Sequence, residues 1–453
     1  MTKKEFEAKL LIQPKELTLL GGEFNGAKNA PIYTNVTADI SYLLGLAGFA
    51  GSIQKIEAPK GLFVLCVGTD AVAQKEYVFE TEEAFYMTVG ADSVTFVGST
   101  LEGMLLGLKS FIRICGETDV IPQMEMMDYP NIAFRSVHTC MFPLDDGTDK
   151  ENSTIADVKR MMRTAAICGY NYIFVEFWGM FPYSMDYAHW PEAYSKEEIA
   201  DLVSYGMDKL YIRPLPGQNL TTHAAWSRIS SRKHVVLDQR PDKADLYIPG
   251  GWCFATENPE TQQFLMTVMD ELLELFRNPP YLHACCDKAF GFASTEHDRM
   301  FSADILFAKH VTFLSSYLAR KNTRMIMWAD MLYSSMDALY WKCDPKTASY
   351  LPKNIVMNIW THENPGNDWQ DPEFFESKGF STIYAPFMNA QGIDSMVSLC
   401  HKRGSMGIVQ TTWHRPQTAA FYVGLTGALQ WCGVRPEDAK VEQHKKTWYC
   451  PQV

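Results

Sequence analysis

Eight short apolar runs recur along the chain from about residue 131 onward, and segments with helical spacing of apolar residues separate several of them. The apolar runs lie at residues 132–139, 171–177, 210–215, 281–287, 325–331, 355–361, 381–387 and 407–414. The helical segments include residues 156–168, 196–209, 261–277, 303–320 and 417–432. Nearly continuous apolar strands, each followed by a helix, are typical of a parallel sheet buried on both faces. Eight such units predict a (β/α)8 barrel.

A doubly wound open sheet is the alternative arrangement of the same elements. Such a sheet usually carries a Gly-rich phosphate-binding turn after an early strand, and no turn of that kind follows one here. Two connectors, residues 216–260 and 362–379, are longer than ordinary loops. In a barrel such loops often carry ligand contacts, so both are expected near the functional site.

The first 128 residues have a different pattern of predicted strands and helices from the rest of the chain. Residues 62–67 and 94–97 are predicted to be strands, residues 77–89 alternate like a strand pair, and residues 101–115 have helical spacing. A connector with two prolines, residues 121–130, follows them. We therefore expect a small α/β domain at residues 1–128 and the barrel at residues 129–453.

Composition narrows the class of protein. The 453 residues are 47% hydrophobic and 21% charged, as in ordinary soluble globular proteins. The net charge of -12 disfavours nucleic acid or an anionic membrane as a partner. The amino terminus has no apolar signal segment, no run approaches the length of a membrane span, and the eleven cysteines are scattered. These features predict a reduced, cytoplasmic protein.

Polar and aromatic residues follow the predicted strands, where an α/β barrel keeps its chemistry. They are Arg135, His138, Glu176, Trp178, Gln218, Asp287, Lys288, Trp328, Asp330, Trp360, His362, Glu363, Tyr384, Asn389, Trp413, His414 and Arg415. Indole faces stack on the C–H faces of sugars, while carboxylates and Arg bind hydroxyls, so the mixture suits a carbohydrate. Core packing is the simpler interpretation of any one Trp, but the repetition at Trp328, Trp360 and Trp413 makes pocket walls an equal alternative.

Several of these segments resemble the family 20 glycoside hydrolases, the β-N-acetylhexosaminidases, over nearly the whole chain. Phe134-Arg135 is similar to the family's first-strand motif, and residues 176–183 (EFWGMFPY) with residues 193–199 (AYSKEEI) resemble its hexosaminidase D-like branch. The residues 101–109 look like the closing helix of the family's small first domain. Pro216-Gly-Gln218 stands where the family has a His in third place.

The fourth strand carries the family's His-x-Gly-x-Asp-Glu signature in altered form, as His283-Ala-Cys-Cys-Asp287-Lys288. The resemblance implies that Asp287 polarises the substrate's own 2-acetamido group, supported by His283. The family's Glu protonates the leaving oxygen in this substrate-assisted mechanism. Lys288 takes its place here, and a side chain with a pKa of about 10.4 is a poor general acid.

The resemblance also assigns roles to residues on other strands. Arg135 would bind sugar hydroxyls, Trp328, Trp360 and Trp413 would form the walls of the pocket, and Asp330 and Tyr384 would face the acetamido group. These assignments imply a terminal amino sugar as the partner, with no cofactor. The expected activity is that of a retaining exo-glycosidase with an altered mechanism.

Three hypotheses account for Lys288. Another carboxylate acts as the acid, with Glu176, Asp330, Glu296 and Glu363 as candidates. Alternatively Lys288 contacts an anionic group on the sugar, which the basic pair after Trp413 also suggests. In the third hypothesis the barrel is a non-catalytic glycan-binding descendant.

Other chemistries are disfavoured by the pattern of the residues. Cys285 and Cys286 are adjacent on a strand and point to opposite faces, which disfavours a metal site with His283 and Asp287, so no metal is expected. A Cys286 nucleophile lacks an orienting group. A barrel enzyme for a phosphorylated small molecule would be expected to carry a Gly-rich phosphate loop.

Overall fold

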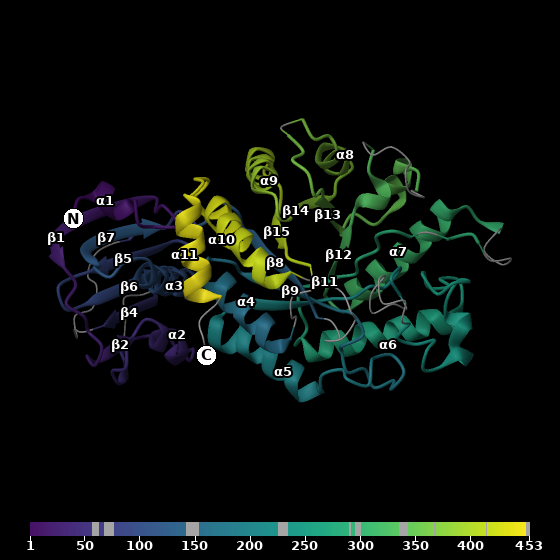
Figure 1. The fold of residues 1–453 in the computed structure, drawn as a ribbon, viewed down its shortest axis with the longest axis horizontal. Helices are drawn as coiled ribbons and strands as arrows, with labels where there is room; N and C mark the ends of the chain where they lie inside the picture. Colours follow the sequence, from purple (N-terminus) through teal and green to yellow (C-terminus); the bar gives the residue numbers. More distant parts are fainter. Residues whose placement is uncertain are drawn as a thin grey trace.

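The computed structural model describes two sheets joined into one elongated molecule (Figure 1). It describes residues 1–56, 63–67, 77–141, 154–224, 234–289, 291–294, 300–334, 343–366, 368–413 and 415–449. The amino-terminal sheet lies at the left of Figure 1 and the barrel at the right.

The amino-terminal sheet has seven strands in the order β1-β7-β5-β6-β4-β2-β3. Its strands are β1 (Glu16–Glu23), β2 (Ile32–Thr34), β3 (Ile53–Lys55), β4 (Phe63–Val67), β5 (Phe85–Val89), β6 (Val94–Gly98) and β7 (Pro122–Asp128). Only β2 and β3 pair in parallel. The helices of this part are α1 (Lys3–Glu7), α2 (Ser41–Leu46) and α3 (Leu101–Glu117). Thr100 caps α3 by accepting from the Gly103 N–H, and the buried face of α3 covers the sheet.

Eight parallel strands close into a barrel, which confirms the fold predicted from the apolar runs. The strands are β8 (Phe134–Met141), β9 (Tyr172–Phe177), β10 (Arg213–Gly217), β11 (Tyr281–His283), β12 (Arg324–Trp328), β13 (Val356–Trp360), β14 (Ser381–Ala385) and β15 (Gly407–Thr411). The surrounding helices are α4 (Ile155–Ile167), α5 (Lys196–Ser204), α6 (Pro259–Leu275), α7 (Ala303–Arg320), α8 (Asp371–Ser377), α9 (Ala390–Arg403), α10 (Pro416–Cys432) and α11 (Asp438–Trp448).

Alternating side chains of the barrel strands fill its interior in layers. The layer near the amino ends of the strands is apolar and consists of Phe134, Phe174, Leu215, Ile326, Val356, Ile383 and Val409. Buried polar residues lie further along the strands. His283 and Asn358 lie one inward position beyond Tyr281 and Val356, and His138 lies two inward positions beyond Phe134. Polarity in the interior therefore rises toward the carboxyl ends of the strands.

Three local differences separate the structure from the prediction. The connector predicted at residues 121–130 contains β7, which pairs with both β1 and β5. Of residues 77–89, only β5 is a strand. The third barrel strand begins at Arg213, because the π-helix Tyr205–Leu210 and the left-handed residue Tyr211 (φ 51°) precede it. None of these differences moves a strand out of the barrel.

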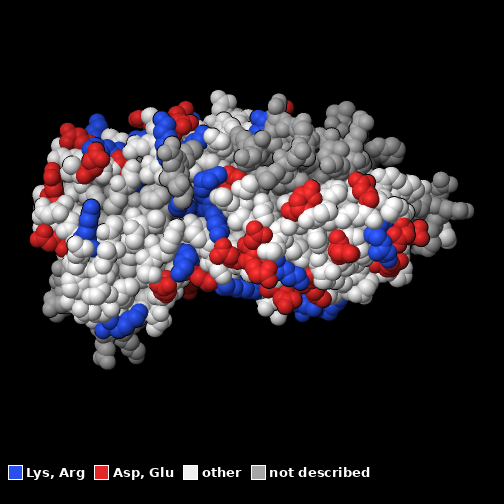
Figure 2. All heavy atoms as spheres, turned by 60° about the horizontal axis from the view of Figure 1, so that its bottom comes forward, with Lys and Arg blue, Asp and Glu red and all other residues white. Residues whose placement is uncertain are grey.

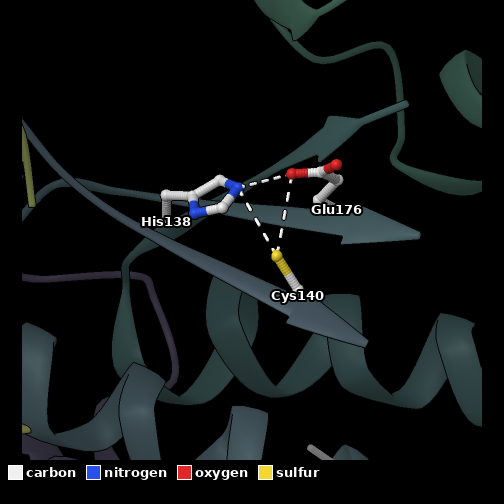
Figure 3. A group of neighbouring side chains, drawn as sticks. All are labelled: His138, Cys140 and Glu176. Atoms are coloured by element: carbon white, nitrogen blue, oxygen red, sulfur yellow. Dashed lines mark hydrogen bonds and ion pairs between the residues drawn. The ribbon is translucent and has the colours of Figure 1, made fainter. Parts of the chain in front are cut away.

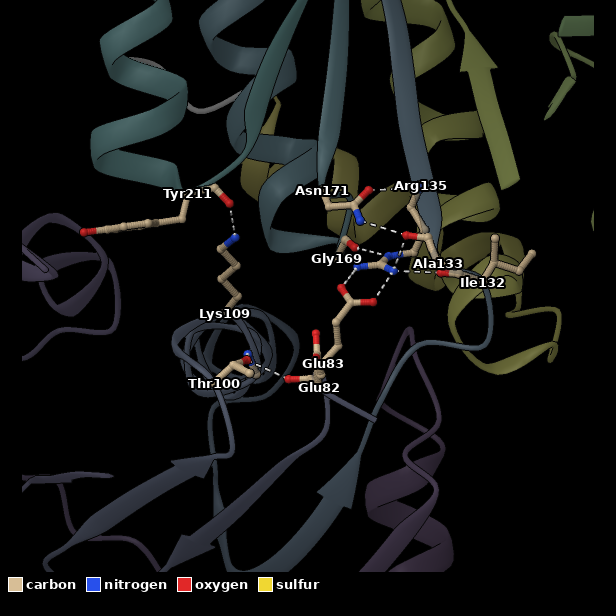
Figure 4. Close-up of polar contacts among 11 residues, drawn as sticks. Glu82, Glu83, Thr100, Lys109, Ile132, Ala133, Arg135, Gly169, Asn171 and Tyr211 are labelled. Carbon is tan, nitrogen blue, oxygen red and sulfur yellow. Dashed lines mark hydrogen bonds and ion pairs between the residues drawn. The ribbon is translucent and has the colours of Figure 1, made fainter. Parts of the chain in front are cut away.

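Arg135 joins the two parts of the molecule (Figure 4). Its guanidinium is fully buried and forms an ion pair with Glu83, at 2.5 Å between Nη2 and Oε1. It also donates to the carbonyl oxygens of Gly169 and Ile132, both at 2.7 Å. Arg135 is the second residue of β8, so it lies at the amino end of the barrel. Its side chain points outward, toward the first domain.

The last two helices also bridge the two sheets, and Figure 1 shows them in yellow between them. Helix α11 contacts α3, α4 and α10. The Trp431 indole in α10 donates to the carboxylate of Asp128, at the end of β7, at 2.9 Å. Burial raises the pKa of Asp128 to about 6, although the Trp431 hydrogen bond opposes the shift. Helices α10 and α11 thus contact both the first domain and the barrel.

Charges are mixed on the face shown in Figure 2, where Lys and Arg side chains lie among Asp and Glu side chains. The described residues of that face form no broad basic area of the kind that binds nucleic acid. Across the described part of the chain, none of the helices combines the length and apolar character needed to cross a membrane.

We expect Arg135→Met to lower the free energy of unfolding by about 3 to 5 kcal/mol, because it leaves Glu83 and three carbonyls without their buried cation. Urea denaturation measures the change. Arg277→Met is the matched control, since Arg277 pairs with Asp208 on the surface and such pairs contribute about 0 to 1 kcal/mol. Equal effects of the two substitutions would contradict a structural role for Arg135.

Candidate active site

The candidate site lies at the carboxyl ends of the strands and centres on the chain that follows β11. This strand has only three residues, and Cys285, Cys286 and Lys288 after it have φ angles of 59°, 69° and 52°. Backbone bonds to β12 hold the turn, with Ala284 N–H donating to Ile326 O and Trp328 N–H donating to Cys285 O, both at 2.8 Å. Left-handed backbone is unusual for residues with a Cβ and is often found at functional sites.

Asp287 is the buried carboxylate of this turn. Its Oδ2 lies 2.5 Å from the Lys288 Nζ and 3.6 Å from the His223 Nε2. Burial alone would raise the pKa of Asp287, but the Lys288 charge and the contact with His223 outweigh burial and hold the pKa well below its usual range. The carboxylate is therefore ionised at neutral pH, and its Oδ2 already has partners.

Lys288 extends from the turn to the Asp287 carboxylate and across the face of Trp360, with its Nζ 5.3 Å from the ring centroid. Burial lowers its pKa, but Asp287 and Asp330 together raise the pKa above its ordinary value. The ammonium group thus holds its proton more tightly than a free Lys does. This is the opposite of what a general acid needs.

Asp330 is a second carboxylate near Lys288, at the start of the short 3-10 helix Asp330–Leu332 that follows β12. Its Oδ1 is buried without a hydrogen-bond partner among the described residues. Burial and the negative charge of Asp287 raise its pKa to about 6, although Lys288 and a hydrogen bond with Trp360 act in the opposite direction. Asp330 is therefore a carboxyl group that exchanges its proton close to neutral pH.

The three predicted tryptophans lie together with Cys285 and Ala385 in one cluster. Trp328 is only 1% exposed, and its ring centroid lies 5.4 Å from that of Trp413 and 4.4 Å from that of His283. Trp328 is therefore a core residue and forms the base of the cluster. Trp360 and Trp413 are exposed in part, as expected of residues that line a pocket.

His283 does not support Asp287, contrary to the prediction. Its Nδ1 accepts from the Cys285 N–H at 3.2 Å and its Nε2 faces the Asn358 amide at 3.1 Å. Burial lowers the pKa of His283 to about 3, so the ring is neutral. Because β11 points His283 into the barrel below the turn, the residue orients the turn backbone rather than the carboxylate.

The histidine beside Asp287 is His223, which the sequence pattern did not single out. Its ring lies between Trp178 and Trp252, at centroid distances of 5.4 and 4.4 Å. The Trp252 indole donates to the Lys288 backbone carbonyl at 2.8 Å. Both His223 and Trp252 come from the long connector at residues 216–260, whose length was the only available signal.

The roles predicted for Arg135 and Tyr384 in the pocket are wrong, because side chains alternate along a strand and these two point away from the barrel interior. Arg135 lies at the amino end of β8 and is fully buried in the ion pair with Glu83, so it does not line the mouth. Tyr384 is also buried and points outward from β14, where its hydroxyl lies 3.3 Å from Ser405 Oγ. Ser405 precedes β15, so this contact is at the amino end of the barrel as well.

The remaining candidate acids are placed less favourably than Asp330. Glu176 is 2% exposed, contacts His138 at 2.7 Å and accepts from the Asn219 amide at 2.8 Å. Glu363 is exposed, as is Arg415 at the start of α10. Glu296 and His414 lie outside the described residues.

Comparison with known proteins places this geometry in a family. The model of the glycosyl hydrolase family 20 catalytic domain matches residues 168–420. No curated protein matches the sequence. The match covers more than half of the chain and includes β11, the turn with Asp287, the strands that carry Trp328 and Trp360, and the 3-10 helix that begins at Asp330.

Solved structures share the fold at low sequence identity. A β-N-acetylhexosaminidase from Bacteroides fragilis has a TM-score of 0.68 and 16% identity, over 94% of this chain and 91% of that one. A chitobiase from Flavobacterium johnsoniae has a TM-score of 0.70 and 15% identity, over 99% and 73%. A β-N-acetylhexosaminidase from Streptomyces coelicolor has a TM-score of 0.65 and 12% identity, over 99% and 97%. From its barrel and the match to the catalytic domain, the chain belongs to glycosyl hydrolase family 20.

Proposed function

We propose that this protein is a retaining exo-glycosidase for terminal 2-acetamido sugars and works by substrate-assisted catalysis. The observation that carries the proposal is the ionised, buried carboxylate of Asp287, paired with Lys288, whose ammonium group lies over the partly exposed Trp360 ring. An anionic acceptor next to aromatic surfaces suits the amide N–H and the apolar face of an acetamido sugar.

Asp287 polarises the acetamido group in this proposal. Lys288 and His223 both contact its Oδ2, so Oδ1 is the oxygen that we assign to the substrate N–H. When Asp287 Oδ1 accepts a hydrogen bond from the substrate N–H, the acetamido oxygen becomes more nucleophilic toward the anomeric carbon. Lys288 then acts as a positioning residue, because its ammonium group keeps Asp287 ionised and fixes its orientation.

We assign proton donation to Asp330. A general acid works best when its pKa is near the working pH, and the pKa of about 6 meets this condition while that of Lys288 does not. Its Oδ1 has no hydrogen-bond partner among the described residues, so no bond to that oxygen would have to break for Asp330 to donate its proton. Asp330 would protonate the glycosidic oxygen and afterwards accept a proton from the attacking water.

A glycan-binding protein without catalysis is the second candidate. The observation that favours it is the 2.5 Å contact between Lys288 and Asp287, which occupies an oxygen of the carboxylate and neutralises its charge. Stacking on Trp360 and Trp413 would still hold a sugar in such a protein. The two candidates differ in turnover and not in binding.

We expect Asp287→Asn to reduce kcat/KM for an aryl β-N-acetylglucosaminide by at least about 100-fold, because the neutral amide polarises the acetamido group poorly. Asp208→Asn, a surface substitution, is the control and should leave the rate unchanged. A thiazoline that mimics the cyclised intermediate should raise the Tm of the unsubstituted protein.

These two measurements separate the candidates. Thiazoline binding without measurable hydrolysis, together with turnover gained only in Lys288→Glu, would favour the glycan-binding protein. Hydrolysis that survives Asp287→Asn unchanged would contradict the assigned mechanism. Absence of both hydrolysis and thiazoline binding would reject an acetamido sugar as the ligand.

The protonation of Asp330 predicts a pH dependence that can be measured without turnover. Folding raises the pKa of Asp330 from about 3.8 to about 6. Between pH 3.8 and pH 6, the folded protein therefore keeps a proton on Asp330 that the unfolded chain has already released. The free energy of unfolding should therefore fall as the pH rises from about 4 to about 6. Asp330→Asn should make this slope shallower, whereas Asp208→Asn should not. An unchanged slope in Asp330→Asn would contradict the raised pKa.

The same group should shape the rate profile if the protein is active. Because Asp330 must be protonated to donate, kcat/KM should decline as the pH rises above about 6. The decline should be absent in Asp330→Asn, whose residual rate should be lower by a factor of about 100 to 10,000. A profile that retains the decline in this variant would assign the acid to another residue.

A further inference from the structure

Three side chains that the proposed mechanism does not use converge inside the barrel, below the mouth (Figure 3). His138 and Cys140 come from β8 and Glu176 comes from β9. His138 Nε2 lies 2.7 Å from Glu176 Oε2, and Cys140 Sγ lies 3.8 Å from that nitrogen and 3.7 Å from that oxygen. All three residues are 2% exposed or less.

The geometry does not fit a nucleophile with its base. In a Cys-His-carboxylate arrangement the thiol and the carboxylate contact different ring nitrogens, so that the ring can take a proton on one side while it is oriented on the other. Here both groups face Nε2 of His138. One nitrogen, one sulfur and one oxygen therefore surround a common point.

Charge also favours a cation at this point. Among the described residues, no Lys or Arg forms an ion pair with Glu176; its neighbours are His138, Cys140 and the amide of Asn219. An ionised carboxylate buried without a cation is costly. Asn219 donates to the other carboxylate oxygen, Oε1, at 2.8 Å, which orients Oε2 toward His138 and Cys140.

Two of the three distances are close to those of a tetrahedral zinc site. Zinc binds imidazole nitrogen and carboxylate oxygen at about 2.0 to 2.2 Å and thiolate sulfur at about 2.3 Å, which places the ligand atoms roughly 3.4 to 3.6 Å apart. The two contacts of Cys140, at 3.7 and 3.8 Å, are close to this spacing. The contact between His138 and Glu176, at 2.7 Å, needs to open by about 0.7 Å to admit the ion.

We propose that His138 Nε2, Cys140 Sγ and Glu176 Oε2 form a zinc-binding site in the barrel interior. A mixed nitrogen, sulfur and oxygen set suits Zn²⁺ better than Mg²⁺ or Ca²⁺, which prefer oxygen ligands alone. Binding would release the thiol proton of Cys140. Three protein ligands leave the fourth position for water.

The proposed site lies close to the turn after β11. Cys285 in this turn packs against Trp328, and the ring centroid of Trp328 lies 5.9 Å from that of His138. Cys285 is two residues before Asp287 in the sequence. A zinc ion at this point would therefore lie near the turn that carries the proposed catalytic carboxylate.

The test measures metal binding by the full chain, without reference to activity. The protein is stripped with a chelator, dialysed against Zn²⁺, and its zinc content is measured by mass spectrometry; a parallel sample takes Co²⁺ for absorption spectroscopy. Cys140→Ser and Glu176→Gln remove one ligand each. Cys286→Ser is the matched control, because this buried thiol accepts a hydrogen bond from Thr221 at 3.1 Å and lies outside the three-residue cluster.

We expect about one zinc per chain in the unsubstituted protein and in Cys286→Ser, with a thiolate-to-cobalt charge-transfer band in the Co²⁺ sample. Cys140→Ser and Glu176→Gln should bind zinc at least about 10- to 100-fold more weakly, and Cys140→Ser should lose the band. Zinc binding that Cys140→Ser retains in full, or a Co²⁺ spectrum of the unsubstituted protein without the band, would overturn the proposal. The second result does not depend on whether any variant folds.

Discussion

The alternation of side chains in a closed barrel is the constraint on which the rest of this structure depends. Each strand presents every second residue to the interior, so a shift of one residue decides between the site and the outer core. Glu176 and Trp328 point inward and take part in the polar end of the barrel. Arg135 and Tyr384 point outward, and their hydrogen bonds instead lie at the amino end, where Arg135 holds the first domain.

The turn after β11 breaks this alternation and thereby creates the candidate site. Its left-handed residues bring Asp287 and Lys288, which are neighbours in the sequence, into direct contact. The cation stabilises the buried carboxylate in its ionised form. Burial raises the pKa of Asp330, and the charges of Lys288 and Asp287 shift that pKa in opposite directions. Replacing the expected Glu by Lys therefore changes the whole electrostatic arrangement of the mouth, beyond the loss of one proton donor.

The interior of the barrel separates two kinds of polar group. Asp287, Lys288 and Asp330 lie near the mouth and interact through charge. His138 and Glu176 lie deeper and are held by short hydrogen bonds within the barrel wall. His283, which the sequence associated with Asp287, belongs to the deeper group, because β11 ends before the turn carries Asp287 away from it.

The sequence alone determined the barrel and most of its helices, because apolar strands and amphipathic helices follow from local spacing. It also located Asp287, Lys288 and Asp330 after predicted strands, because the end of a strand can be recognised from the local pattern of apolar residues. Only the tertiary structure decided which histidine contacts Asp287, since His223 lies in a connector without regular periodicity. It also decided the pKa of Asp330, because that value depends on burial and on charges brought together from different strands.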